Sequence, residues 1–229
     1  MTFEKDEKDR AVFCDYYQGW LGGKLFRWLD RRKVRIIKRV LAELGEGLRV
    51  VDLGCGAAGI SSRLVGALPG IRVIGVDNDA RLLDVAQRRG LEVKLGDLDK
   101  PLPVEPGSCD VVLMIDTLEH VQCRKETMAE VKRILTERGV LVVFTPAHDT
   151  VSWTLGVRVH TFITRRTSFD HISPFTKESL SWYLKQNFSG WHVGHTNFGL
   201  TLYGIGRGKT GKVGFGRTMF GIGDDRRSE

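Results

Sequence analysis

The octapeptide Asp52-Leu53-Gly54-Cys55-Gly56-Ala57-Ala58-Gly59 decides the fold of this 229-residue chain, because it overlaps the end of the apolar run Leu48–Leu53. An apolar run that ends in a glycine-rich turn is typical of a strand and a loop whose backbone approaches a ligand at the start of a helix. The pattern therefore predicts a strand at 48–53 and, after the loop, a helix that ends at Leu68. Taken alone, it does not identify the ligand.

The residues beyond this loop repeat the alternation of strand and helix. Apolar runs of strand length predict further strands at 71–76, 91–95, 110–115 and 140–145. Helical spacing predicts helices at 79–89, 124–135 and 176–187. Strands that alternate with helices are parallel and joined by right-handed crossovers, so the fold class is α/β with a doubly wound sheet. The short link between the last two apolar runs, 191–196 and 200–205, predicts an antiparallel pair at the sheet edge.

Three carboxylates follow three successive predicted strands: Asp52, Asp77 and Asp97. In a doubly wound sheet these strand ends converge on the crevice where ligands bind. Asp77 stands 23 positions after Gly54, close to the separation of about 20 expected for an acid that binds a ribose diol. Plainer roles stay open, because Asp77 could cap the following helix and Asp97 could belong to a polar turn.

The charge of Asp52 bears on which nucleotide cofactor fits this crevice. A pyrophosphate dinucleotide would suffer like-charge repulsion from this carboxylate, which makes a nicotinamide oxidoreductase a remote alternative. S-adenosylmethionine carries a sulfonium and an ammonium group, so an acidic rim suits it. The residues therefore favour the methyl donor.

These motifs resemble those of class I S-adenosylmethionine-dependent methyltransferases over residues 48–206. The resemblance rests on five motifs: 52–56, Asp77, 96–97, 110–112 with 118–121, and 139–141. It implies a Rossmann-like seven-stranded sheet with a reversed last strand and helices on both faces. It also implies cofactor-binding residues, namely Asp52, Gly54, Cys55, Gly56, Gly59, Asp77, Asn78, Asp97, Leu98 and Ile115.

The same resemblance divides the chain into parts. Residues 1–47 would form a helical extension over the site, and 48–206 the methyltransferase domain. Separately, the glycine-rich composition of 204–223 predicts that 207–229 is a flexible tail. Residues 147–174 would form an insert that acts as a lid over the acceptor, with a solvated loop as the plainer alternative. The residues expected to cover the substrate are Tyr17, His148, Arg165, Arg166 and His171.

His120 follows the fourth strand and is the candidate general base, since a histidine that titrates near neutrality can take a proton from a hydroxyl. Its alternative role is to pack or to orient the loop. Asp116, Glu119, His120 and His171 form a less favoured metal site, similar to that of small-RNA terminal 2′-O-methyltransferases. Asp116 stands where a longer glutamate would be expected there, and the main expectation is that no metal binds.

The expected function is methyl transfer from S-adenosylmethionine to an oxygen, or a nitrogen, of a small-molecule or lipid-like acceptor. Two alternatives remain open: an RNA methyltransferase with a metal-assisted site, and a cofactor-binding module without catalysis. A missing ribose acid, or a degraded glycine loop, would have favoured the cofactor-binding module. The sequence has neither defect.

The net charge of +7 is concentrated in one segment. The stretch 24–39 holds eight basic residues and a single acid, Asp30, so it accounts for the whole excess. That distribution makes nucleic acid an unlikely partner. Helical spacing over 24–44 predicts an amphipathic helix with Trp28 on its apolar face. This helix either packs on the sheet or contacts an anionic membrane surface.

The cysteines and the N-terminus bear on the compartment. Four cysteines show no Cys-x-x-Cys pairing, and the chain begins with a charged run at 4–10. We expect a cytoplasmic protein, with peripheral contact to a membrane as the open addition.

Overall fold

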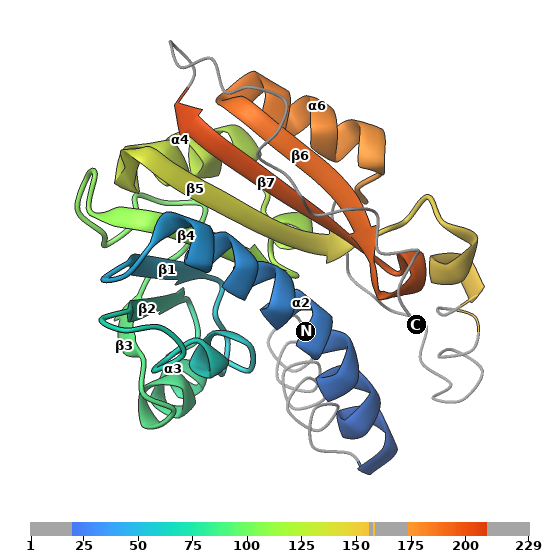
Figure 1. The fold of residues 1–229 in the computed structure, drawn as a ribbon, viewed down its shortest axis with the longest axis horizontal. Helices are drawn as coiled ribbons and strands as arrows, with labels where there is room; N and C mark the ends of the chain where they lie inside the picture. Colours follow the sequence, from blue (N-terminus) through green and yellow to red (C-terminus); the bar gives the residue numbers. More distant parts are fainter. Residues whose placement is uncertain (1–19, 156–157, 159–173, 210–229) are drawn as a thin grey trace, which may run out of the picture.

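The computed structural model describes residues 20–155, 158 and 174–209 (Figure 1). Its centre is a seven-stranded sheet in the order β3-β2-β1-β4-β5-β7-β6. The strands are β1 (Arg49–Leu53), β2 (Arg72–Asp77), β3 (Glu92–Leu95), β4 (Cys109–Ile115), β5 (Leu135–Pro146), β6 (Phe188–Thr196) and β7 (Thr201–Lys209). Strand β7 is antiparallel to both β5 and β6, and the other neighbouring pairs are parallel. The predicted doubly wound sheet with a reversed last strand is confirmed.

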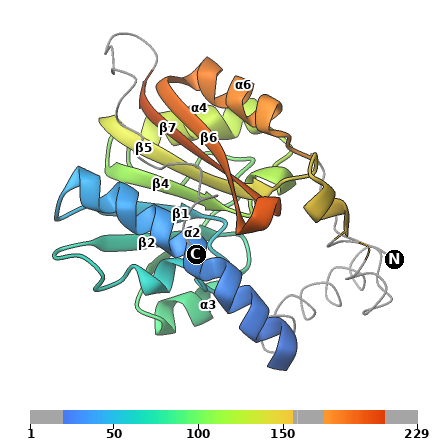
Figure 2. The same cartoon turned by 45° about the vertical axis from the view of Figure 1, so that its right-hand side comes forward.

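Helices cover both faces of the sheet, as predicted (Figure 2). They are α2 (Trp20–Leu44), α3 (Ala80–Arg88), α4 (Arg124–Ile134) and α6 (Lys177–Asn187), with short turns η1 (Ser61–Arg63), η2 (Leu118–His120) and η3 (Asn197–Gly199). Successive side chains of a strand point to opposite faces. Along β4, Val111 and Leu113 therefore pack with α2 and α3, whereas Val112 and Met114 pack with α4 and α6.

Helix α2 crosses the sheet, and its N-terminal half projects beyond it (Figure 1). Ile37, Val40 and Leu41 are fully buried, and their spacing places them on one side of the helix. Gly45 ends the helix with a φ of 107°. The prediction that Trp28 shares this apolar side is wrong. Nine residues separate it from Ile37, which is two and a half turns, so the two side chains point in opposite directions.

The helix predicted to end at Leu68 is also wrong. Only η1 and a series of turns follow the glycine loop. Gly66 adopts a φ of 71°, and two consecutive serines precede it, so the local sequence favours turns over a helix. The glycine loop therefore meets no helix N-terminus.

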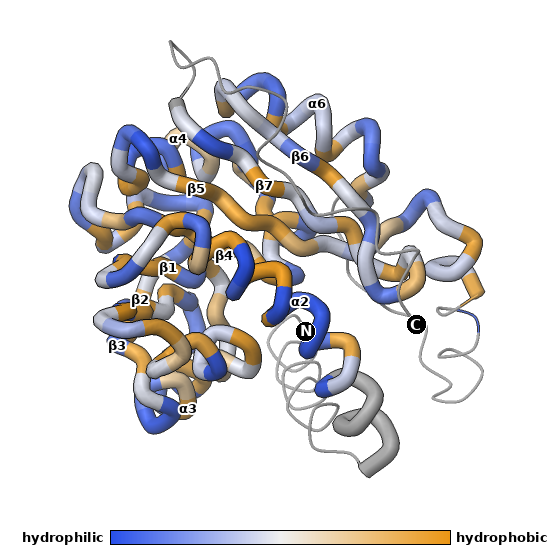
Figure 3. Tube along the Cα trace, viewed as in Figure 1, coloured by the Kyte–Doolittle hydropathy of each residue, from blue (hydrophilic) through white to orange (hydrophobic). Residues whose placement is uncertain are grey.

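The C-terminal part differs from the prediction in one detail. Strand β7 continues to Lys209, three residues into the segment expected as a tail. Within the predicted insert, residues 151–155 form a helical turn, and most of the remainder lies outside the described residues. Hydrophobic residues concentrate along β4 and β5 at the centre of the sheet (Figure 3). Within the part of the chain that is described, no helix has the length and apolar character needed to cross a membrane.

A capping box fixes the start of α6. The Thr176 hydroxyl accepts from the Ser179 N–H at 3.1 Å, and the Ser179 hydroxyl accepts from the Thr176 N–H at 2.9 Å. Thr176→Ala is expected to lower the free energy of unfolding by about 1 kcal/mol, as measured by urea denaturation. Gln186→Ala, on the exposed side of the same helix, should leave it within about 0.5 kcal/mol of the parent. Equal stability of the two variants would contradict the capping role.

Candidate functional site

The three predicted carboxylates lie at one edge of the sheet. Asp52 is the last residue but one of β1, just before Leu53. Strand β1 runs parallel to β2, which ends in Asp77. The Gly96 N–H donates to the Asp77 carbonyl at 2.9 Å, so Asp97 begins its turn beside the end of β2. The expected convergence of these strand ends is present.

Asp77 braces the glycine loop with its carboxylate. One oxygen accepts from the Gly56 N–H at 2.8 Å, and the other accepts from the Asp79 N–H at 2.9 Å. The helix cap is Asp79, whose side chain accepts from the Arg81 N–H, so the alternative role of Asp77 as a cap does not hold. The carboxylate of Asp77 is therefore held in position before any ligand arrives.

The glycine loop also lies against the segment that follows β4. Gly54 has a φ of 71°, and a Cβ at this position would lie 2.4 Å from Cγ2 of Thr117. Only glycine fits both the backbone conformation and this contact. The next segment is strained as well, since Asp116 has a φ of 52°. The loops after β1 and β4 thus form one continuous wall.

Asp52 is a buried acid that has no cationic partner in the described part of the chain. It is 3% exposed, and its Oδ1 has no hydrogen-bond partner among the described residues. Burial raises its pKa to about 7, the Ser61 hydroxyl opposes the rise, and the Asp77 charge adds to it. Neither Asp52 nor Asp77 forms an ion pair with a described residue. This edge of the sheet therefore has an uncompensated affinity for positive charge.

The remaining predicted cofactor residues occupy different surroundings. Asp97 accepts from the Asp99 N–H at 3.0 Å, and this bond, with the nearby Lys100, lowers its pKa. Asn78 is exposed at the end of β2, whereas Gly59, Leu98 and Ile115 are half-buried. The Cys55 side chain is buried against β2, since a Cβ on Gly75 would lie 2.7 Å from its Sγ. Cys55 thus turns its thiol to the core.

A polar cluster that the sequence did not reveal joins α2 to this wall. Asp30 and Lys33 are both buried on α2. Lys33 Nζ donates to Asp116 Oδ2, and Arg63 Nη2 lies 3.9 Å from Asp30 Oδ2. The available signal was Asp30 itself, the lone acid in the basic stretch, which stands three residues before Lys33 and so shares its side of the helix.

Glu119 completes this cluster as a fully buried carboxyl group. It is 0% exposed, and neither oxygen has a hydrogen-bond partner of ordinary distance and angle among the described residues. Burial raises its pKa to about 8, with the Asp116 charge as the next contribution. The Glu119 backbone N–H, the Thr145 hydroxyl and, least, the Lys33 charge act in the opposite direction. Near neutral pH we therefore expect Glu119 to hold its proton.

The predicted base and metal ligands are not brought together as a set. His120 is exposed at the end of η2, while Glu119 is buried and Asp116 is paired with Lys33. His171 lies outside the described residues. Across those residues, no three histidine, cysteine or acidic side chains are grouped to hold a metal ion.

Of the predicted lid residues, the structure describes only His148. Its ring meets Trp153 edge-on, with ring centroids 5.0 Å apart, and burial lowers its pKa. It lines a hollow of about 300 Å³ with Val151, Leu155 and Arg158. Tyr17, Arg165, Arg166 and His171 lie outside the described residues.

Comparison with known proteins agrees with this geometry. A family model described as a methyltransferase domain matches residues 51–143. The chain is 37% identical over 131 residues to a ubiquinone biosynthesis O-methyltransferase from Albidiferax ferrireducens, with 52% of this chain and 50% of that protein covered. It is 28% identical over 126 residues to a trans-aconitate 2-methyltransferase from Variovorax paradoxus, with 53% and 48% covered.

An uncharacterized 37.1 kDa protein of a Streptomyces fradiae transposon is 36% identical over 112 residues, with 46% of this chain and 32% of that protein covered. The chain thus spans a half or less of these curated relatives. Among solved structures, an S-adenosylmethionine-dependent methyltransferase from Thermotoga maritima matches with a TM-score of 0.69 at 20% identity, covering 87% of this chain and 98% of that one. This last likeness concerns the fold alone. Family model, relatives and strand order agree that the chain carries a class I S-adenosylmethionine-dependent methyltransferase domain.

Proposed function

We propose that this protein transfers a methyl group from S-adenosylmethionine to an oxygen of a small or lipid-like acceptor. The observation that carries the proposal is the edge of the sheet where Asp52, Asp77 and Asp97 meet the glycine loop. When bound there, the cofactor supplies a methyl carbon already activated by the sulfonium, so catalysis depends mainly on alignment of the acceptor.

The residues at this edge fit S-adenosylmethionine. No described residue makes a hydrogen bond to the buried Oδ1 of Asp52, and a neighbouring cation would relieve the unfavourable burial of this carboxylate. Asp77 would hold the ribose hydroxyls, since its carboxylate is already fixed by two backbone N–H groups. Asp97 would accept from the adenine amino group. A nicotinamide dinucleotide fits less well, because its pyrophosphate would face Asp52.

An oxygen acceptor is supported by the relatives and by the segment after β4. The relatives include ubiquinone biosynthesis O-methyltransferases and trans-aconitate 2-methyltransferases. Thr117 lies against the glycine loop, and His120 stands three residues after it. The His120 N–H donates to the Thr117 carbonyl. We assign His120 as the group that takes the acceptor proton, while the Lys33–Asp116 pair joins α2 to the segment that precedes it.

The test is to incubate the full chain with S-adenosylmethionine labelled in its methyl group and a fractionated cell extract. Label is expected in the small-metabolite or lipid fraction, on oxygen. Label in RNA or protein, or on nitrogen, would replace the proposed acceptor class. Full turnover by His120→Ala would remove His120 from its assigned role.

Cofactor binding is expected to release protons. A cation placed beside Asp52 lowers the pKa that burial raises to about 7, so part of a proton should leave each molecule at pH 7. Calorimetric titration in two buffers with different ionisation enthalpies measures this number. Asp52→Asn should bind without that release. Buffer-independent binding heats in the parent protein would contradict the role of Asp52.

A further inference from the structure

Exposed apolar side chains gather at one end of the molecule. Seven large hydrophobic side chains are exposed among the described residues. Four of them belong to segments that meet at this end: Trp28, Val151, Leu155 and Phe198. Val151 is 84% exposed and Phe198 is 68% exposed. Apolar groups that are left in water at one place indicate an interaction surface.

Contacts between the segments show that this surface is continuous. The Trp28 and Phe198 rings stack with centroids 5.6 Å apart and planes 13° apart, which joins α2 to η3. The Thr150 hydroxyl donates to the Gly199 carbonyl at 2.8 Å, which joins η3 to the helical turn at 151–155. Three segments that are distant in sequence therefore build one face.

The turn that carries Phe198 is strained. Asn197 and Phe198 have φ values of 54° and 57°, and a bulky residue in this region costs about 1 kcal/mol or more. The turn is held by the buried Asn197, whose side chain donates to the Thr201 hydroxyl at 3.3 Å. The strain places an aromatic ring in solvent, which internal packing does not require.

Arginines accompany these apolar groups. Arg31, Arg32, Arg35 and Arg39 follow Trp28 by three, four, seven and eleven residues, so all five lie along one side of α2. The stripe is about 16 Å long at the rise of an α-helix. The Arg32 guanidinium lies 5.4 Å from the Trp28 ring centroid and 4.6 Å from that of Phe198. None of the four arginines forms an ion pair with a described residue.

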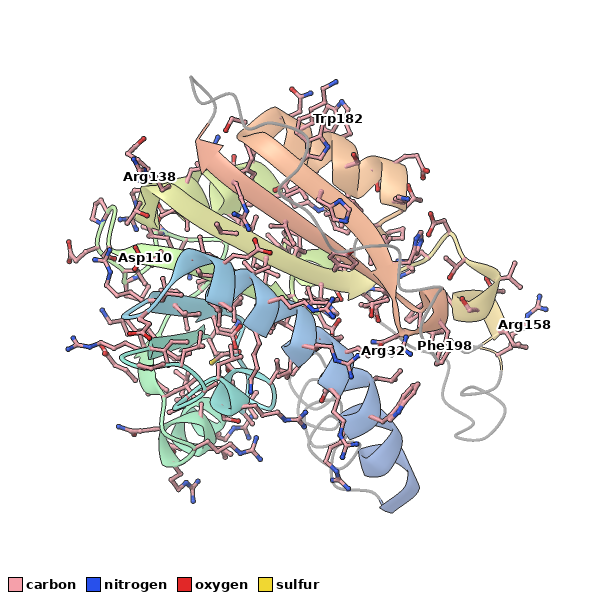
Figure 4. All side chains as sticks on the ribbon, viewed as in Figure 1. Arg32, Asp110, Arg138, Arg158, Trp182 and Phe198 are labelled. Carbon is pink, nitrogen blue, oxygen red and sulfur yellow. The ribbon has the colours of Figure 1, made fainter. Side chains whose placement is uncertain are left out.

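The opposite side of α2 is not available as an interaction surface. It holds the buried Ile37, Val40 and Leu41, which pack on the sheet, and the buried pair Asp30 and Lys33. The expected membrane contact through the apolar face of the 24–44 helix therefore cannot form without removing α2 from the core. Arg32, Phe198 and Arg158 instead lie toward the same end of the molecule (Figure 4).

We propose that this face, which we name the aromatic–arginine face, docks on an anionic lipid bilayer. It comprises Trp28, Val151, Leu155 and Phe198 with Arg31, Arg32, Arg35, Arg39 and Arg158. The apolar groups would enter the headgroup region and the guanidinium groups would meet lipid phosphates. The aliphatic Val151 and Leu155 favour lipid over RNA, and Trp28 and Phe198 already stack on each other, which leaves less ring surface for bases. This inference does not depend on methyl transfer.

The experiment is co-sedimentation of the full chain with vesicles of phosphatidylcholine alone and of phosphatidylcholine with phosphatidylglycerol. Binding is expected only to the vesicles that contain phosphatidylglycerol. It should weaken as the salt concentration rises, because salt screens the attraction between the arginines and the lipid phosphates. A parallel measurement with single-stranded RNA uses the same proteins.

Matched variants separate this face from general charge and hydrophobicity. Trp28→Gln with Phe198→Asn removes the rings, and asparagine tolerates the left-handed backbone; its control is Trp182→Gln, an exposed tryptophan on α6 (Figure 4). Arg31→Glu with Arg35→Glu reverses two charges, and its control is Arg72→Glu with Arg138→Glu, also exposed. Both test variants should lose vesicle affinity by about tenfold or more, whereas both controls should keep it.

Three results would overturn the proposal. They are absence of binding to the phosphatidylglycerol vesicles, equal losses in test and control variants, and binding to RNA without binding to vesicles. Thermal unfolding of each variant verifies that the folded protein is compared. Because every substituted side chain is exposed or partly exposed, the variants should retain the parent unfolding temperature within a few degrees.

Discussion

Asp77→Ala is expected to weaken the binding of S-adenosylmethionine about 100-fold, which corresponds to about 2.7 kcal/mol. The substitution removes the acceptor proposed for the ribose hydroxyls. It also removes the two hydrogen bonds, from the Gly56 and Asp79 N–H groups, that fix the glycine loop. Charge-assisted hydrogen bonds of this kind contribute about 1.5–3 kcal/mol each. Calorimetric titration of both proteins gives the ratio of dissociation constants.

Two further variants make this result specific. Asp84→Ala removes an exposed carboxylate from α3 without touching the loop, and it should bind as the parent does. Asp77→Asn keeps one carbonyl oxygen and should fall between the parent and Asp77→Ala. If Asp77→Ala remained folded and bound the cofactor with unchanged affinity, the ribose assignment would be wrong.

Glu119→Gln is expected to remove a large part of the pH dependence of stability. Burial raises the pKa of Glu119 from 4.5 to about 8, so the folded state holds a proton that the unfolded state releases. The resulting stabilisation is fully present below pH 4.5 and is lost as the pH rises through about 8. Each pKa unit of difference corresponds to about 1.4 kcal/mol, so the total amounts to a few kcal/mol.

Urea denaturation at pH 5 and at pH 8.5 measures this effect. The parent should lose stability between the two values, and Glu119→Gln should lose distinctly less. Some pH dependence of stability should remain in Glu119→Gln, because Asp52 also has a raised pKa, of about 7. Glu178→Gln, at an exposed position of α6, is the matched control and should follow the parent. The same pH dependence in all three proteins would show that Glu119 does not hold a proton in the folded state.

Much of the fold followed from local sequence signals. The apolar runs predicted the strands, and the short link after Thr196 predicted the antiparallel pair, because strand pairing there is set by neighbouring residues. The three acids at strand ends were placed correctly because parallel strands end at the same edge of a sheet. The motif residues of the site therefore lie at the ends of strands that the apolar runs predict.

The parts that were not predicted depend on contacts between distant segments. Lys33 and Asp116 are 83 residues apart, and their pairing exists only because α2 crosses this part of the sheet. Trp28 was assigned to the wrong side of α2 because tryptophan was counted as an apolar residue. Its position relative to Ile37 instead places the Trp28 side chain on the exposed side of the helix. The missing helix before Leu68 is an exception, because local residues, namely Ser61, Ser62 and the left-handed Gly66, already disfavour a helix there.

Helix α2 contributes to both the cofactor edge and the aromatic–arginine face. Its buried side supplies Asp30 and Lys33 to the wall beside the cofactor edge, and its exposed side supplies Trp28 and the arginines. Loss of vesicle binding should therefore leave cofactor affinity unchanged, since the two sides have no residue in common.

The most direct test of the central claim is calorimetric titration of the full chain with S-adenosylmethionine and with its demethylated product. The proposed site at Asp52, Asp77 and Asp97 predicts one saturable binding event per chain with each of the two ligands. Absence of binding at millimolar ligand, or tighter binding of a nicotinamide dinucleotide, would contradict it.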